Sequence, residues 1–136
     1  MQTLVLDTNI VLDLFVFADA RARPLHEHLA QGNVNWLATA AMRDELEHVL
    51  AYAHIEAKLE FYQRPAGEVL ARFDRHASIV DAPVKAPVTC KDPDDQKFID
   101  LAVAHRCTLL SKDREILRMR KRLAQLQVVA TTHLAA

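Results

Sequence analysis

The chain has 136 residues, of which 51% are apolar and 26% charged, a size and composition typical of one folded domain. With 2 glycines and 5 prolines, it is neither collagen-like nor low in complexity. The 17 Lys and Arg nearly balance the 18 Asp and Glu, and the formal net charge is −1, so any nucleic-acid contact requires a local basic patch.

The first third of the chain predicts two units in which a strand is followed by a helix. Residues 3–6 form a short apolar run closed by a polar cluster, which is typical of a buried strand. Helical spacing of apolar side chains follows over 10–17, and a second helix is expected over 24–32. A second strand is expected over 34–38, and a third helix over 39–50.

The remaining chain continues the alternation of helices and strands. In order, it predicts helices within 53–76 separated at Pro65 and Gly67, a strand at 78–80, a loop over 81–95, a helix from Asp95, a strand at 107–110, a helix over 113–123 and a strand at 127–130. This alternation predicts a single α/β domain over 1–136, a three-layer α/β/α sandwich around a mostly parallel sheet of about five strands. Ligand sites in such sheets lie beyond the carboxyl ends of the strands.

The cysteines and the first apolar run favour a cytoplasmic protein. The two cysteines form no Cys-x-x-Cys pair, so neither a disulfide framework nor a structural zinc site is expected. The apolar run over 4–17 is interrupted by Asp7, Asn9 and Asp13. It is too short to cross a bilayer, and no basic residue precedes it as in a signal peptide. We expect no membrane contact.

Carboxylates follow the predicted strands, and we expect them to converge on one edge of the sheet. They are Asp7 after the first strand, Glu45 in the helix after the second, Asp92, Asp94 and Asp95 on the loop into a later helix, and Asp113 after the strand at 107–110. Like charges at close range repel, and a divalent cation removes that cost. Oxygen ligands favour Mg²⁺ or Mn²⁺ over zinc, and such a site promotes phosphodiester hydrolysis.

Helix capping is the alternative interpretation of several of these residues. Asp7, Asn9, Asp95 and Asp113 all precede predicted helices, and a capping Asp or Asn contributes about 1 kcal/mol. Glu45 lies about two turns into its helix, so the alternative there is an exposed surface glutamate. The convergence of all these carboxylates on one edge favours the metal site over a set of independent caps.

Four sequence blocks occur in order between residues 4 and 113. They are Leu4-Val5-Leu6-Asp7-Thr8-Asn9-Ile10, Thr39-x-x-Met42-x-x-Glu45-Leu46-x-x-Val49-Leu50, Cys90-Lys91-Asp92-Pro93-Asp94-Asp95-x-x-Phe98-Ile99-x-Leu101-Ala102, and Leu109-Leu110-Ser111-Lys112-Asp113. With these blocks the chain resembles PIN-domain ribonucleases, especially toxins of bacterial toxin–antitoxin pairs. No block falls in 53–80.

The resemblance implies roles for individual residues. The metal-binding and catalytic acids fall on Asp7, Glu45, Asp95 and Asp113, with Asp92 as an additional metal-binding acid and Thr8, Asn9 and Ser111 as supporting polar residues. The implied activity is Mg²⁺- or Mn²⁺-dependent hydrolysis of RNA. The implied partners are the RNA substrate, an antitoxin protein and a second copy of the chain.

Basic residues around Asp113 are the candidates for substrate binding. They are Lys112, which stands where the family more often has a small residue, and Arg114, Arg118 and Arg120, within a basic cluster that includes Lys121 and Arg122. They are placed to hold RNA phosphates near the acids. The alternative is a solvated helix face.

Two other functional classes remain as alternatives. A phosphoacceptor receiver-like signalling domain would use Asp7, Asp81 and Lys112, but it requires paired acids after the first strand, where Thr8 follows Asp7. A phosphohydrolase with an Asp-x-Asp motif is excluded because residue 9 is Asn. A non-catalytic PIN-like RNA-binding module is the second alternative, and the four intact acids argue against it.

Overall fold

A computed structural model of the chain describes residues 1–134. The strands are β1 (Gln2–Leu6), β2 (Val34–Ala38), β3 (Ala77–Ile79), β4 (Thr108–Leu110) and β5 (Val129–Thr131). The helices are α1 (Thr8–Phe15), α2 (Arg23–Gln31), α3 (Ala40–Leu50), α4 (Ala53–Phe61), α5 (Ala66–His76), α6 (Gln96–His105), α7 (Arg114–Leu117) and α8 (Arg120–Gln125). Two short 3₁₀ turns, η1 (Ala20–Ala22) and η2 (Pro93–Asp95), precede α2 and α6.

The five strands form one parallel sheet in the order β3-β2-β1-β4-β5. In the centre, Leu4 of β1 lies opposite Trp36 of β2 and Thr108 of β4. The middle of β1 is fully buried, as expected of a central parallel strand whose residues are apolar without alternation. The α/β fold class predicted from the sequence is confirmed.

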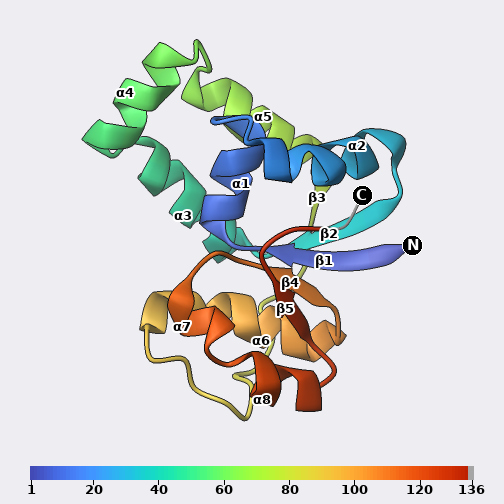
Figure 1. Cartoon of the computed structure of the whole chain (residues 1–136). Helices are drawn as coiled ribbons and strands as arrows, with labels where there is room; N and C mark the ends of the chain where they lie inside the picture. The colour runs from blue at the N-terminus through green and yellow to red at the C-terminus, as the bar shows by residue number, and fades with distance from the viewer. Residues whose placement is uncertain (135–136) are drawn as a thin grey trace.

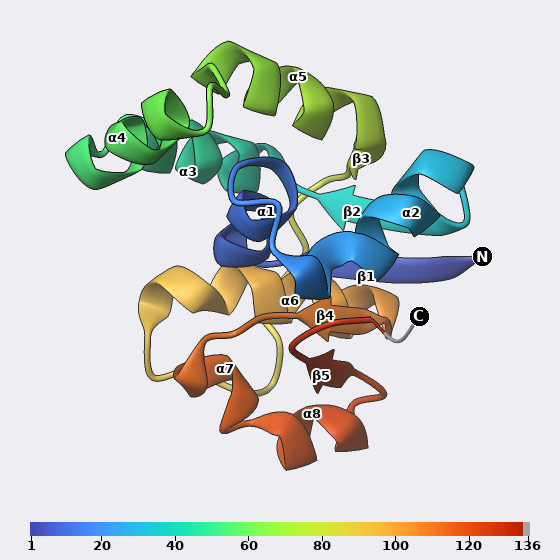
Figure 2. The ribbon, with the colours of Figure 1, turned by 45° about the horizontal axis from the view of Figure 1, so that its top comes forward.

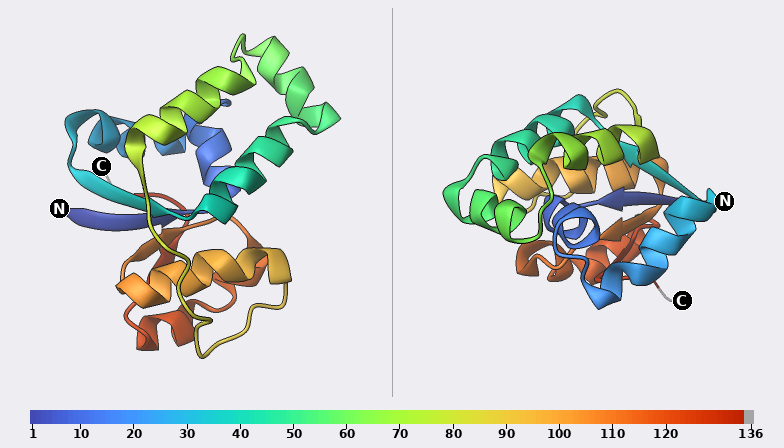
Figure 3. Two further views of the ribbon diagram at one scale, coloured as in Figure 1. Left: turned by 180° about the vertical axis from the view of Figure 1, so that it is seen from behind. Right: turned by 90° about the horizontal axis from the view of Figure 1, so that it is seen from above.

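Helices cover both faces of the sheet. Figure 1 shows α1 to α5 on one side and α6 to α8 on the other, and the same division is visible from behind in Figure 3. This division follows from the strand order, because right-handed crossovers that run towards β3 and those that run towards β5 must lie on opposite faces. Within residues 1–134, every helix is too short or too polar to cross a membrane.

Helices α4 and α5, which we call the helical arm, extend away from the sheet (Figures 2 and 3). The inner side chains of the arm are buried, and Phe73 packs edge-on against Trp36 with ring centroids 5.0 Å apart. Its tip exposes Phe61 and Tyr62. Pro65 directly precedes α5, whereas Gly67 lies inside its first turn, so the proline alone marks the predicted break.

The largest departure from the sequence-based elements lies near the carboxyl terminus. The single helix predicted over 113–123 is two helices, α7 and α8, because the chain turns at Met119, which keeps Ile116 and Leu123 fully buried on either side. Strand β5 begins at Val129 rather than at Gln127. Gln127 has a φ of 66°, a left-handed conformation that no strand residue adopts.

Candidate metal centre

The centre lies where the connections of the sheet diverge. Strands β1 and β4 are neighbours, but the chain leaves β1 towards β2 and leaves β4 towards β5. A crevice forms at such a switch point in parallel sheets, and ligands bind there. Asp7 follows β1 directly, and its backbone N–H donates to the carbonyl of Leu110 at the end of β4, at 3.0 Å. The main chain therefore fixes Asp7 at the edge.

Asp7 is buried and its carboxylate is held on both oxygens. The residue is only 3% exposed; Oδ1 accepts from the N–H of Asn9 at 2.7 Å, and Oδ2 accepts from Ser111 Oγ at 2.6 Å. Burial raises the pKa of Asp7, and the two hydrogen bonds offset part of this rise because they favour the charged form. Asp7 thus caps α1, as the alternative interpretation predicted, and also faces the centre.

Ser111 connects two of the predicted acids. Besides donating to Asp7, its fully buried Oγ accepts from the N–H of Asp113 at 3.0 Å. Asp113 in turn caps α7 through Oδ1, which accepts from the N–H of Glu115 at 2.8 Å. The backbone of Ser111 is itself tied to β5, because its N–H donates to the carbonyl of Thr131 at 3.0 Å.

Three carboxylates come together beside this serine. Asp92, Asp95 and Asp113 each offer an oxygen, and these oxygens lie within 4.8 Å of one another. Asp92 uses Oδ1 to accept from the N–H of Asp94 at 2.9 Å. Acids from two separate parts of the chain are therefore neighbours: the loop before α6 supplies Asp92 and Asp95, and the segment after β4 supplies Asp113.

Asp95 differs from the capping acids. It stands at the amino-terminal end of α6 but makes no capping hydrogen bond. The residue is 8% exposed, and its Oδ2 is buried with no hydrogen-bond partner within residues 1–134. Burial, followed by the charges of Asp113, Asp7 and Asp92, raises the pKa of Asp95 to about 7. Capping therefore does not account for Asp95.

A divalent ion fits these residues. The donor set is made of carboxylate oxygens, which suit Mg²⁺ or Mn²⁺. A buried carboxylate oxygen without a partner is costly, and a cation at that point would satisfy it. Asp7 lies near enough for its charge to raise the pKa of Asp95.

Glu45 is placed differently from the other three acids. It projects from α3, its Oε2 accepts a hydrogen bond from Thr8 Oγ1, and its Oε1 is 2.6 Å from Lys97 Nζ. Lys97 lies in the first turn of α6 and also donates to the carbonyl of Asp94 at 2.5 Å. Sequence reasoning assigned Lys97 no role, although it follows Asp95 by two residues in the same block.

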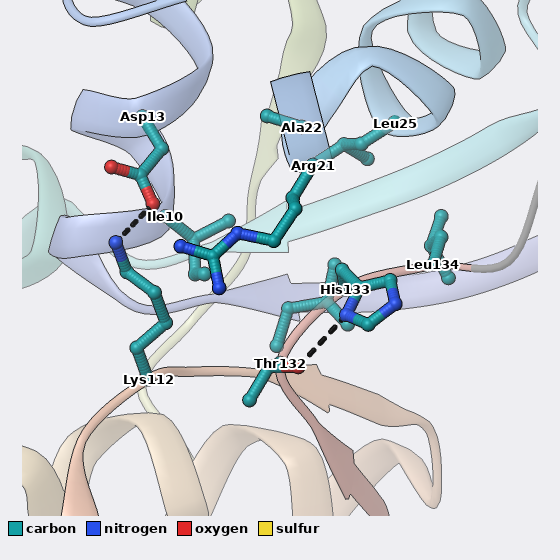
Figure 4. Close-up of a pocket in the computed structure, with 10 residues that line it drawn as sticks. Ile10, Asp13, Arg21, Ala22, Leu25, Lys112, Thr132, His133 and Leu134 are labelled. Atoms are coloured by element: carbon teal, nitrogen blue, oxygen red, sulfur yellow. Dashed lines mark hydrogen bonds and ion pairs between the residues drawn. The ribbon is translucent and has the colours of Figure 1, made fainter. Parts of the chain in front are cut away.

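Of the residues predicted to support the site or bind substrate, some contact the acids, whereas the basic ones lie at a separate pocket or on exposed helix surfaces. Thr8 supports Glu45, whereas Asn9 contacts Asp7 through its backbone and is exposed. Lys112 pairs with Asp13 of α1 across a small pocket that Arg21 and His133 also line (Figure 4). Arg114, Arg118 and Arg120 are exposed on α7, α8 and the turn between them, and Arg118 is 3.7 Å from Glu115.

Comparison with known proteins agrees with this architecture. The family model of the PIN domain matches residues 3–115, so the chain belongs to the PIN domain family. Its structure is similar to a chain of VapBC2 from Rickettsia felis, and the VapBC2 structure was solved bound to a DNA fragment from the VapBC2 promoter. The TM-score is 0.62 at 16% identity, over 95% of this chain and 98% of that chain, and this likeness shows the fold. A search of curated proteins found no match.

Proposed function

We propose that the protein is a Mg²⁺- or Mn²⁺-dependent endoribonuclease formed by the single domain 1–136. The metal-binding and catalytic acids would be Asp7, Glu45, Asp95 and Asp113, with Asp92 as an additional ligand. The observation that carries the proposal is the buried Asp95 Oδ2 without a partner, beside two further carboxylates and within a PIN domain. A buried carboxylate oxygen without a hydrogen-bond partner costs folding stability, and such a group is typical of a functional site.

The residues of the chain would prepare the site for a phosphodiester. A divalent ion supplies charge neutralisation for the phosphate and makes a nearby water more acidic. Ser111 would orient Asp7 and Asp113 relative to one another, because it contacts both. Thr8 would orient Glu45 in the same way. Asp95 must lose its proton to serve as a ligand, so its raised pKa makes ion binding depend on pH.

The proposed substrate is RNA, held by cations next to the acids. Arg114, Arg118 and Arg120 present exposed guanidinium groups in the residues that follow Asp113, and such cations bind backbone phosphates. Lys112 would join them only by sharing its charge between Asp13 and a phosphate. Asn9 is exposed beside Asp7 and would contact the substrate or its water.

The proposal is tested by metal binding and RNA cleavage in parallel. Calorimetry with Mn²⁺ should give binding by the wild type that Asp7→Asn removes, and the same variant should lose cleavage of a mixed RNA pool. Asp81→Asn is the matched control, because Asp81 is an exposed aspartate after β3 and also the acceptor required by the receiver alternative. Full cleavage by Asp7→Asn would refute the assignment, and binding without cleavage would favour the RNA-binding module.

We extend the proposal to a toxin of a toxin–antitoxin pair that acts in the cytoplasm. The similarity in fold to a chain of VapBC2 supports this, and the partner would be a small antitoxin protein. Expression of the chain alone should then arrest growth, whereas the Asp7→Asn variant should be harmless. Harmless expression of the active protein would contradict the toxin role and leave the nuclease proposal standing. The homodimer stays a prediction, which sedimentation analysis tests.

A further inference from the structure

Glu45 is the proposed metal ligand that already pairs with a cationic side chain. Thr8 Oγ1 donates to one of its oxygens, and the Lys97 ammonium lies 2.6 Å from the other. Asp95, by contrast, keeps an oxygen that contacts no donor within residues 1–134. The same site therefore holds one acid with a resident counter-ion and another without one.

The position of Lys97 is fixed from two directions. Its ammonium donates to the carbonyl of Asp94 at 2.5 Å as well as to Glu45, so it bridges α3 and the loop that carries Asp92 and Asp95. Its side chain is 27% exposed and that of Glu45 is 26% exposed. Across residues 1–134, Lys97 is the one cationic side chain in an ion pair with any of the four catalytic acids.

We propose that Lys97 is an exchangeable counter-ion that neutralises Glu45 until a divalent cation arrives and then releases it. This inference rests on the proposed function. Lys97 and an incoming cation are like charges that compete for the same carboxylate, so each weakens the other's interaction with Glu45. Lys97 thereby keeps the metal-free centre from carrying four uncompensated carboxylates, and it lowers the affinity for metal.

A purely structural ion pair predicts the opposite effect. If Lys97 only held Glu45 in place, its loss would leave the ligand mobile and would weaken metal binding. A partly exposed ion pair of this kind also contributes little to folding by itself. The direction of the change in metal affinity therefore separates the two roles.

The first measurement is Mn²⁺ calorimetry on the full chain, with Lys97→Met beside the wild type. We expect Lys97→Met to bind Mn²⁺ at least about threefold more tightly, because a competing positive charge is removed. Lys97→Arg keeps the charge and should stay within about twofold of the wild type. Lys91→Met is the matched control, since Lys91 is exposed on the same loop and forms no ion pair within the described residues. Unchanged or weaker binding by Lys97→Met would overturn the inference.

The second measurement is the melting temperature with and without Mn²⁺. Lys97→Met should melt below the wild type in the presence of EDTA, because the acids have lost their counter-ion. Saturating Mn²⁺ should remove most of that difference. A deficit that persists in saturating Mn²⁺ would make Lys97 a structural link and overturn the inference. A wild type that binds no Mn²⁺ would overturn both this inference and the proposed function, whereas identical binding by the wild type and Lys97→Met would overturn the inference alone.

Discussion

On the helical arm, Asp74 lies 2.7 Å from Arg43, and Glu68 lies 3.2 Å from Arg72. Both pairs are exposed, and the hydrogen bond from Arg43 holds the pKa of Asp74 below its usual value. At the carboxyl edge of the sheet, Asp95 is buried beside other acids, and its pKa is raised to about 7. The same type of side chain is thus neutralised in one region and left uncompensated in the other.

This contrast separates stability from function. Exposed ion pairs on helices contribute a few tenths of a kcal/mol each, so the arm gains a little from every pair. At the edge, burial and the charges of neighbouring acids both oppose the charged forms of Asp7 and Asp95 and raise the pKa of each. Such an arrangement is typical of a functional site.

The contrast is tested most strongly by removing one carboxylate from each region. Asp95→Asn should lower metal-dependent RNA cleavage at least about a hundredfold, because a proposed ligand is removed. It should also raise the metal-free melting temperature, since the repulsion disappears. Asp74→Asn should leave cleavage unchanged and cost about 0.5 kcal/mol of stability. Cleavage assays and thermal melts in EDTA check both variants, and similar behaviour of the two would contradict the contrast.

A smaller effect is expected from the hydroxyl that connects two acids. Ser111→Ala removes the donor to Asp7 and the acceptor of the Asp113 N–H, so cleavage should fall about tenfold to a hundredfold. Stability should fall by about 1 kcal/mol because these hydrogen bonds are no longer formed. Ser78→Ala, on the exposed strand β3, is the control and should match the wild type in rate. A wild-type rate for Ser111→Ala would show that the acids need no such orientation.

The arginines that follow Asp113 should contribute to RNA binding, whereas the arginines of the helical arm should not. Replacing Arg118 and Arg120 together with Gln should weaken RNA binding several-fold and reduce the slope of log affinity against log salt by about 1.4, or about 0.7 for each phosphate that is no longer neutralised. Replacing Arg72 and Arg75 of the arm with Gln should leave that slope unchanged. Binding titrations at several salt concentrations measure it, and an unchanged slope for the first pair would assign these arginines to a solvated helix face.

The buried carboxyl group of Asp95 should also make stability depend on pH. Because the folded-state pKa of Asp95 is raised from 3.8 to about 7, the folded protein binds more protons than the unfolded chain between these values. The stability of the metal-free protein should therefore fall as pH rises through this window. Melting temperatures in EDTA at pH 5 and pH 8 test this, and the decrease should be smaller in Asp95→Asn. Equal pH dependence in both proteins would remove Asp95 as the cause.

The positions of Asp7 and Asp113 could be predicted from the sequence because the local pattern of residues identifies the strand that each of them follows. Short apolar runs ending in polar residues identified β1 and β4, and parallel strands bring their carboxyl ends to one edge. Asp7 and Asp113 were therefore placed correctly beyond these strands. The helix over 113–123 was wrong because the turn at Met119 depends on packing under β5 and not on local spacing.

The ion pairs at and beside the centre could not be predicted from the sequence. Lys97 and Glu45 are 52 residues apart, and Lys112 meets Asp13 beside a pocket that Ile10 and Leu110 also line. Periodicity indicates which face of a helix is buried, but the partner of a polar side chain depends on where neighbouring elements dock. Lys112 was predicted from its place beside Asp113 alone, so its pairing with Asp13 was missed.

The last strand of the chain completes the candidate centre. Ser111, which donates a hydrogen bond to Asp7, is itself bonded to Thr131 in β5, so the centre joins residues that lie more than 100 positions apart in the sequence. A chain emerging from the ribosome presents Asp7 and Glu45 long before Ser111 and Thr131 have been synthesised. With the proposed function, the site of the nascent nuclease stays incomplete until Ser111 and the strand that holds it, β5, have been synthesised.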